Sequence, residues 1–233
     1  MPDFDIDPNF SVYGLVDRTR QDSAEMNHRI TMTVISNEIE NATLLDNADN
    51  IIFSGFQRMS RFLPQVERYR QIAQRAEAVY VFGVPDVTPP PIENITYVPL
   101  KENQQLFKEW FLVSYGQDYF SALATEELTH IDDPDPDRIF KGVWTFELDL
   151  VHILFEWLSA TTDRRPEMLP EDGHNLKRQA ELMNNSIGRM SLRVMNKEYN
   201  DTVRQELNTI VGHGVNPALK ALRGQLGGAA TTV

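Results

Sequence analysis

Residues 55–86, GFQRMSRFLPQVERYRQIAQRAEAVYVFGVPD, hold the pattern that decides the fold. The run that leads into this stretch, NIIFSGF at 50–56, is short, β-branched and aromatic, which predicts a buried strand. AVYVFGV at 78–84 predicts a second one. Between them, spacings of four, three, four and three predict a helix with one apolar stripe, made of Phe62, Val66, Tyr69, Ala73 and Ala76.

Further elements extend this strand–helix–strand unit in both directions. Upstream, residues 10–20 predict a short helix, and an amphipathic helix is predicted by Met32, Ile35, Ile39 and Ala42. Downstream, a helix is expected at 147–160, and strands are expected at 95–100, 109–116, 118–128 and 140–146, the last two of which could also lead into helices. The predicted class is α/β, a mixed β-sheet with flanking helices followed by a C-terminal helical extension.

The extension carries a second apolar pattern. After a linker-like segment at 161–173, apolar residues recur at a seven-residue repeat, and this candidate interaction helix consists of Leu176, Ala180, Met183, Ile187, Met190 and Val194. A second run continues out of phase from Tyr199 to Ile210. Such a stripe must be buried, either back on the domain or in a homodimer formed through residues 174–210, and the sequence leaves both open.

The composition change near residue 165 suggests three parts. An α/β domain is expected at 1–165, a helical extension at 166–226 and a disordered tail at 227–233.

The bulk composition excludes several classes of function. The formal net charge is -12, which argues against nucleic-acid binding and against adsorption to anionic membranes. The chain has no cysteine, so disulfides and thiolate-bound metals are excluded. No secretory signal begins the sequence, and its most apolar run, at 143–158, carries charges that oppose membrane insertion. We expect a cytoplasmic protein.

No motif for catalysis or for a cofactor stands out. Phosphate-binding, dinucleotide-binding and nucleophile-elbow signatures are all missing. Glu127 with His130, and His152 with Glu156, are single pairs that lack the further ligands of a metal site. Asp133, Asp135 and Asp137 alternate as in the first half of a calcium-binding loop. The position that such a loop reserves for glycine holds Arg138, and the position reserved for glutamate holds Trp144. We expect no enzyme activity, no metal and no cofactor.

An arginine cluster is the candidate ligand site. Arg61, Arg68 and Arg75 are seven residues apart, so on one helix they share a face beside the apolar stripe. Gln57 and Arg58 stand at the end of the preceding strand, where open α/β sheets bind ligands. Two interpretations are open. The cluster is either a site for an anion or an acidic partner, or a solvated flank whose arginines pair with the chain's own carboxylates.

The same segments resemble a known family. FSGFQ with RFLPQVERYRQIAQRAEAVYVFGVPD, then YVPL, EWFLVSYGQDYFSAL and RIFKGVWTFELDLV, together with SNEIEN upstream, are similar to the DICT sensory domain, over roughly residues 10–160. That family occurs in diguanylate cyclases and two-component systems, and proteins similar to this one are common in cyanobacteria. The resemblance implies signalling, with light responses or second messengers as inputs, and no catalytic activity. It supplies no ligand site. The output domains of fused members are not recognisable here.

The resemblance and the stripe together predict a stand-alone, non-enzymatic sensory or adaptor protein of a signalling pathway, acting through protein–protein contacts with a protein partner. Two alternatives remain at this point: a binding domain for an anionic metabolite or nucleotide, and a scaffold or assembly factor of a larger complex. Direct light sensing through a covalent bilin is disfavoured, because its attachment needs a cysteine.

Overall fold

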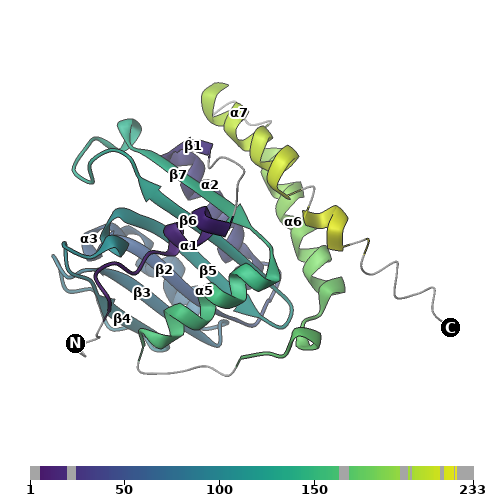
Figure 1. The fold of residues 1–233 in the computed structure, drawn as a ribbon, viewed down its shortest axis with the longest axis horizontal. Coiled ribbons are helices and arrows are strands. Elements are labelled where there is room, and N and C mark those ends of the chain that lie inside the picture. Colours follow the sequence, from purple (N-terminus) through teal and green to yellow (C-terminus); the bar gives the residue numbers. More distant parts are fainter. Residues whose placement is uncertain are drawn as a thin grey trace.

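A central mixed β-sheet with helices on both faces forms the described part of the chain (Figure 1). The computed structural model describes residues 6–19, 25–162, 168–194, 199, 201–215, 218–222 and 224. The sheet has seven strands in the order β1-β7-β6-β5-β2-β3-β4. Along the chain these strands are β1 (Glu25–His28), β2 (Asn50–Arg58), β3 (Ala78–Val84), β4 (Ile95–Pro99), β5 (Glu109–Gly116), β6 (Phe120–Glu127) and β7 (Ile139–Thr145).

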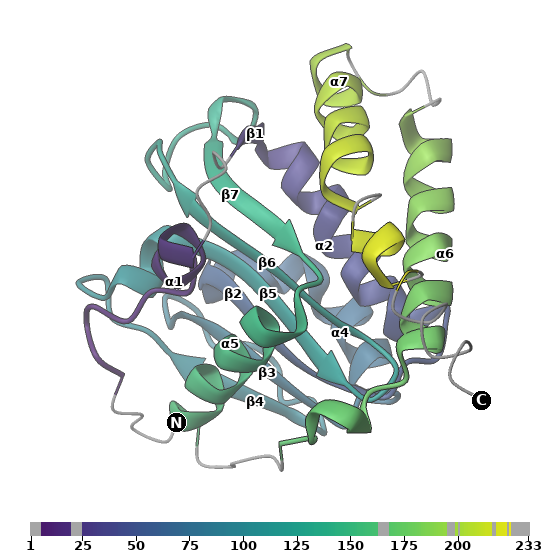
Figure 2. The same ribbon diagram turned by 45° about the vertical axis from the view of Figure 1, so that its right-hand side comes forward.

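The helices divide between the two faces of the sheet (Figure 2). One face is covered by α1 (Val12–Thr19) and α5 (Leu148–Ala160). The other is covered by α2 (Arg29–Leu44), α4 (Val66–Ala73), α6 (Leu176–Val194) and α7 (Asp201–Thr209). Shorter helical turns are α3 (Met59–Phe62), η1 (Leu63–Gln65), η2 (Gln105–Lys108), η3 (Asp135–Asp137), η4 (Glu171–Gly173) and the π-helical η5 (Ile210–Val215).

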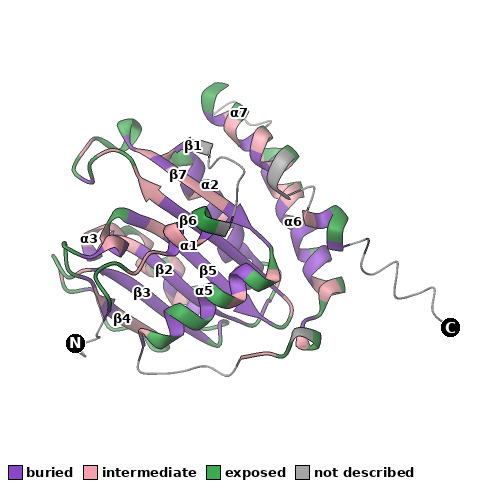
Figure 3. Ribbon diagram, in the orientation of Figure 1, coloured by how far each residue is buried: buried purple, intermediate pink, exposed green. Residues whose placement is uncertain are grey.

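Strand β2 lies at the centre of the sheet and contributes to both cores. It pairs parallel with β3 and antiparallel with β5. Because side chains alternate along a strand, Ile51 and Phe53 pack under α1 and α5, whereas Ile52 packs under α2 and α4. The sheet is buried on both sides over most of its area (Figure 3).

The predicted fold class is confirmed, with two differences in detail. The helix expected from Phe62 to Ala76 is divided into α3, η1 and α4, and the division falls at Pro64, which has no N–H for the helical ladder. Edge strand β1 was not expected. Its sequence, EMNH, has no apolar alternation, so it is recognised as a strand only from its antiparallel pairing with β7.

The C-terminal helices share a core with the sheet. Three of the six stripe residues are buried, namely Ala180, Met183 and Met190, and the other three, Leu176, Ile187 and Val194, are partly buried against the same cluster. That cluster includes Ile35 on α2 and Leu123 on β6. The stripe therefore packs back on the domain within one chain, and the homodimer through 174–210 stays a prediction. Residues 227–233 lie outside the described part.

A buried carboxyl group joins the first helix to the sheet. Glu109, which begins β5, is 0% exposed and caps α1. Its carboxylate accepts hydrogen bonds from the backbone N–H of Val12 at 2.9 Å and of Tyr13 at 3.1 Å, and from the Ser11 hydroxyl at 2.5 Å. Burial raises the pKa of Glu109 to about 7 in spite of these three bonds.

This carboxyl predicts a pH dependence of stability. The folded state holds the Glu109 proton with a pKa of about 7 against an ordinary value of 4.5, so unfolding between these pH values releases a proton and stability falls as pH rises. The Glu109→Gln variant should lose this slope, which amounts to about 2–3 kcal/mol over the window. Urea unfolding of both proteins across this pH range measures it. Parallel curves at every pH would contradict the assignment.

Candidate functional site

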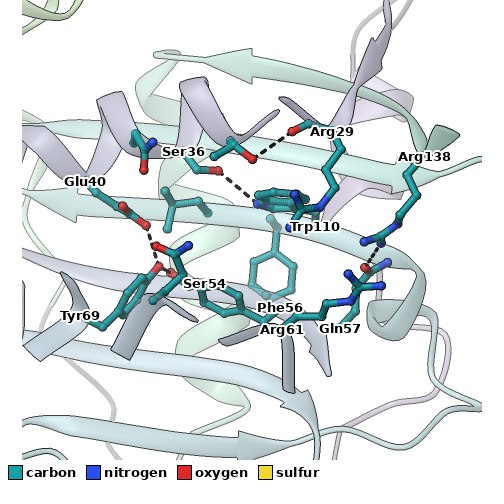
Figure 4. A pocket seen from close by; sticks show the side chains of 16 residues that line it. Arg29, Ser36, Glu40, Ser54, Phe56, Gln57, Arg61, Tyr69, Trp110 and Arg138 are labelled. Carbon is teal, nitrogen blue, oxygen red and sulfur yellow. Dashed lines mark hydrogen bonds between the residues drawn. The ribbon is translucent and has the colours of Figure 1, made fainter. Parts of the chain in front are cut away.

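A polar pocket lies beside the carboxyl end of β2, on the face of the sheet that α2 covers (Figure 4). Its cavity volume is about 120 Å³. One wall is α2; the floor is the end of β2 with the start of β5; the rim is α3, η1 and the residue that precedes β7. Open α/β sheets bind ligands at such strand ends.

A buried ion pair closes one end of the pocket. The Arg138 side chain is 2% exposed and donates to both carboxylate oxygens of Glu127, from Nε at 2.6 Å and from Nη2 at 2.8 Å. Gln57 bridges the pair, since its Oε1 accepts from Arg138 Nη2 at 2.6 Å and its Nε2 donates to Glu127 at 2.7 Å. Burial alone would raise the pKa of Glu127, but the Arg138 and Gln57 hydrogen bonds hold it below its usual value.

The backbone of Gln57 explains how a strand residue reaches this pair. Its φ is 63°, in the left-handed region that L-residues seldom occupy. The pairing of β2 with β3 shifts register between Gly55 and Arg58, as in a β-bulge. The bulge turns the Gln57 side chain toward Arg138. Such local strain persists only when surrounding contacts fix it, and the three-residue network supplies them.

Two further arginines, Arg29 and Arg61, lie on the same side as Arg138, and the three together form the basic end of the pocket. Arg61 donates from Nη2 to the backbone carbonyl of Ile131 at 2.8 Å and from Nη1 to Asp135 at 2.9 Å. Arg29, the first residue of α2, is 3.2 Å from the other oxygen of Asp135. The Arg29 guanidinium also lies 5.8 Å from the ring centroid of Trp110, a cation–π distance. Burial lowers the pKa of Arg29.

The opposite end of the pocket is acidic. Glu40 on α2 is buried and accepts a hydrogen bond from the Tyr69 hydroxyl at 2.9 Å. Since Tyr69 donates there, Ser54 of β2 donates to Tyr69 at 2.6 Å. Arg68 donates to the second oxygen of Glu40. Burial raises the pKa of Glu40 even though Arg68 and Tyr69 oppose this.

Aromatic rings separate the two ends. Trp110 lies between α2 and the sheet, and its Nε1 donates to Ser36 at 3.1 Å. Phe56 packs edge-to-face on Tyr69 at 5.4 Å between ring centroids. Figure 4 shows Trp110 and Phe56 between Glu40 and the arginines. The pocket thus combines an arginine end, an aromatic middle and a carboxylate end, which suits a small polar ligand with a ring.

The structure brings together only part of the arginine cluster. Gln57 and Arg61 line the pocket. Arg61 lies on α3 and Arg68 on α4, on either side of the turn at Pro64, so they do not form one row. Arg68 lies behind the pocket wall, where it pairs with Glu40.

The remaining two arginines point elsewhere. Arg58 pairs with Asp132 at 2.8 Å and with Glu102 at 3.3 Å, both on the surface. Arg75, beyond the end of α4, donates to the backbone carbonyl of Gln71 at 3.2 Å. Neither side chain lines the pocket.

Among the lining residues that sequence reasoning did not assign to the site are Arg29, Glu40, Trp110 and Arg138. The sequence did contain an indication for two of them, Arg29 and Glu40. Arg29 opens a helix, where the helix dipole disfavours a cation unless another group requires it. Glu40 lies one residue from Ile39 of the apolar stripe, at the edge of the buried face. Trp110 and Arg138 carried no local signal, since only the sheet brings them near α2.

The acidic candidates for metal binding have other partners. Glu127 is bonded to Arg138, and Asp133 accepts from the backbone N–H of His130 at 2.8 Å. His152 lies 3.2 Å from the Tyr115 hydroxyl. Over the described ranges, no three residues among His, Cys, Asp and Glu are grouped closely enough to hold a metal ion.

The fold and the pocket define an α/β sandwich with a small-molecule-sized polar cavity at a strand end. A family comparison then places the sequence: residues 10–128, just over half of the chain, match the DICT family, described as a sensory domain in diguanylate cyclases and two-component systems. The chain belongs to the DICT sensory domain family. No curated protein and no solved structure matches it.

The matched range is shorter than the resemblance expected over residues 10–160. It contains α2, β2, α4 and β5, and with them every pocket residue except Arg138. Strand β7, α5 and the C-terminal helices lie beyond it. In the part of the chain that the structure describes, no helix is long and apolar enough to span a bilayer.

The buried pair predicts a large effect on stability. Arg138→Met leaves the Glu127 carboxylate buried without its cation, so unfolding free energy should fall by about 3–5 kcal/mol. The double variant Arg138→Met with Glu127→Leu should recover most of this loss, because no uncompensated charge remains. Urea unfolding of the single and double variants measures both. A single variant within about 1 kcal/mol of the parent protein would show that the pair is not buried as described.

Proposed function

We propose that this protein is a non-enzymatic cytoplasmic sensor that binds a small anionic ligand between α2 and β2, and reports it to a signalling partner through its C-terminal helices. The observation that carries the proposal is the double role of α2. One side of this helix forms a wall of the pocket, and the opposite side holds α6 and α7.

The pocket side of α2 is polar. At 100° per residue its lining positions fall on one narrow face; they are Arg29, Thr33, Ser36, Asn37 and Glu40. A ligand that contacts Arg29 or Glu40 therefore contacts the helix directly, and any shift of the helix moves whatever packs behind it.

The opposite side of α2 is tied to α6 by charge. Glu38, whose side chain is 0% exposed, accepts from Arg189 at 2.5 Å and from Arg193 at 3.1 Å. Asp46, just beyond the end of α2, accepts from Arg189 at 2.9 Å and from Asn185 at 2.8 Å. Buried ion pairs of this kind depend on close geometry, so a small movement of α2 weakens them.

The start of α2 is tied to α7 by hydrogen bonds to one carboxylate. Glu206 lies 2.7 Å from Nδ1 of His28 and accepts from the Thr31 hydroxyl. His28 comes directly before Arg29, which is in the pocket. Both C-terminal helices are thus anchored to the element that a ligand would touch.

The cavity size favours one kind of input. A volume of about 120 Å³ is close to the ~150 Å³ cavity that holds benzene, so it encloses one ring rather than a cyclic dinucleotide. A metabolite is therefore a better candidate than a large second messenger. Nothing in the pocket favours light as the direct signal.

For the output we propose a protein partner or a second copy of the chain, which would bind at the outer side of residues 174–210. On that side Leu192 of α6 is 69% exposed, and the face that packs on the domain is already occupied. Release of α6 or α7 would expose further apolar surface, which is how a domain without a separate output module can change its contacts.

Ligand binding should depend on Arg61 and not on Arg75. A thermal-shift screen of single-ring carboxylates, phosphorylated sugars, nucleotides and cyclic dinucleotides is expected to give a stabilising hit of one-ring size. The shift should be lost in Arg61→Ala and kept in Arg75→Ala, a matched loss of one guanidinium outside the pocket. A hit that both variants retain would place the ligand elsewhere. No hit from the whole anionic set would remove the pocket as a sensor site.

Glu38→Gln should loosen the C-terminal helices without emptying the pocket. With the carboxylate gone, amide hydrogen exchange in residues 182–194 is expected to accelerate about tenfold, because α6 loses its buried charge partner. The matched control is Glu181→Gln, which removes a charge from the exposed pair with Arg178. Equal exchange in both variants would contradict the anchoring role of Glu38.

A further inference from the structure

An acidic side chain from outside the pocket lining already pairs with the arginines at one end of the pocket. Asp135 lies in η3, within the loop between β6 and β7. Its Oδ1 is 2.9 Å from Nη1 of Arg61 and 4.0 Å from Nη1 of Arg138, and its Oδ2 is 3.2 Å from Nη1 of Arg29. One carboxylate thus bridges the guanidinium groups that line the basic end.

These arginines are unequally neutralised. Arg138 has a buried carboxylate of its own in Glu127. The ion pairs of Arg29 and Arg61, by contrast, both go to Asp135. Among the described residues, the buried Nε–H of Arg29 has no hydrogen-bond acceptor. The basic end therefore holds two cations that share one anion and a buried donor that lacks an acceptor, which is an incomplete set of contacts.

We propose that Asp135 is an internal competitor: the ligand is a carboxylate carried on a single ring, which replaces the Asp135 carboxylate between Arg29 and Arg61 and releases the loop at residues 131–137. This inference rests on the proposed function, since it takes the pocket as the sensor site. It adds the chemical class of the ligand and the movement that binding produces.

The bridging geometry fits a carboxylate. The two oxygens of Asp135 are divided between Arg29 and Arg61, one to each. A ligand carboxylate can reproduce this with its own two oxygens in one plane. Its ring would then lie against Trp110 and Phe56, the aromatic residues between the arginines and Glu40 (Figure 4).

The Asp135 contact is suited to displacement. The Asp135 side chain is 47% exposed, so its ion pairs are weakened by water, and the freed carboxylate is readily hydrated. The loop is also held where Arg61 donates to the carbonyl of Ile131 at 2.8 Å. If the Arg61 guanidinium binds a ligand instead, its contacts with Asp135 and with the Ile131 carbonyl weaken together. In the same loop, Asp132 keeps a separate surface ion pair with Arg58 at 2.8 Å, which does not involve the pocket arginines.

The test is a calorimetric titration of the full chain with benzoate. The parent protein is compared with Asp135→Asn and with Asp137→Asn. Asp137 is an exposed residue at the end of the same short helix and, among the described residues, has no ion pair with Arg29, Arg61 or Arg138. Both variants thus remove one charge from one loop, but only Asp135→Asn removes the bridging carboxylate. Asp135→Asn should bind benzoate about five- to tenfold more tightly, since a competing charge is gone. Asp137→Asn should stay within about twofold of the parent protein.

Two further probes define the ligand class. Benzamide has the same ring without the charge and should not bind. Inorganic phosphate should bind more weakly than benzoate, because it lacks the ring; if phosphate binds as tightly, the carboxylate-and-ring assignment is wrong. In the parent protein, benzoate should also accelerate amide hydrogen exchange at residues 131–137, whereas a ligand that leaves Asp135 in place would slow it.

The outcomes separate this inference from the proposed function. If benzoate binding requires Arg61 but is unchanged in Asp135→Asn, the pocket remains a ligand site and the internal competitor is overturned. If benzoate binds neither the parent protein nor Asp135→Asn while another anion from the wider screen does, the ligand class is overturned. If no anion binds in an Arg61-dependent way, both fail. Melting temperatures of the variants establish that each is folded.

Discussion

Two buried carboxylates on one helix determine how this structure is held together. Glu38 and Glu40 are two residues apart on α2, so their side chains leave the helix about 200° apart. Glu40 meets Arg68 and Tyr69 from the β2–α4–β3 unit, while Glu38 meets arginines of α6. A buried carboxylate without a partner is very costly, so α2 requires both neighbours in place.

This requirement links the pocket to the C-terminal helices. The pocket is formed where α2 passes the end of β2, and its position is fixed by the Glu40 contacts. On the other side, the Glu38 contacts fix α6, which is beyond the range matched by the sensory family. A helix clamped from both sides has discrete arrangements rather than a continuous range, and that is the property a sensor needs. The range matched by the family contains every pocket residue except Arg138, and the proposed function assigns the response to the extension.

Sequence patterns predicted the strand–helix–strand unit because its apolar spacing is local. The same is true of the stripe from Leu176 to Val194, whose burial was certain although its partner was not. The pocket could be predicted from the sequence only in part. Gln57 and Arg61 could be found from their place at a strand end, but Pro64 separates Arg61 from the row that Arg68 and Arg75 suggested.

The rest of the site depends on contacts between distant segments. Arg138 comes 81 residues after Gln57, and the two meet only because β6 and β7 lie where the sheet order places them. In the sequence, Arg138 is the last residue of an acidic loop, and Asp135 is one of several aspartates. No local pattern shows that one of these aspartates faces three arginines.

If α2 transmits the loss of one anchor to the other, a double-mutant cycle on the two anchors will show it. Arg68→Met removes a cation from Glu40 and Arg189→Met removes one from Glu38; the two arginines lie on different helices and pair with different carboxylates. We predict that the two losses of unfolding free energy are sub-additive by about 1 kcal/mol or more, since α2 relaxes once either anchor is lost. Losses that add to within about 0.5 kcal/mol would show that the two sides of α2 are independent and that α2 does not couple the pocket to α6.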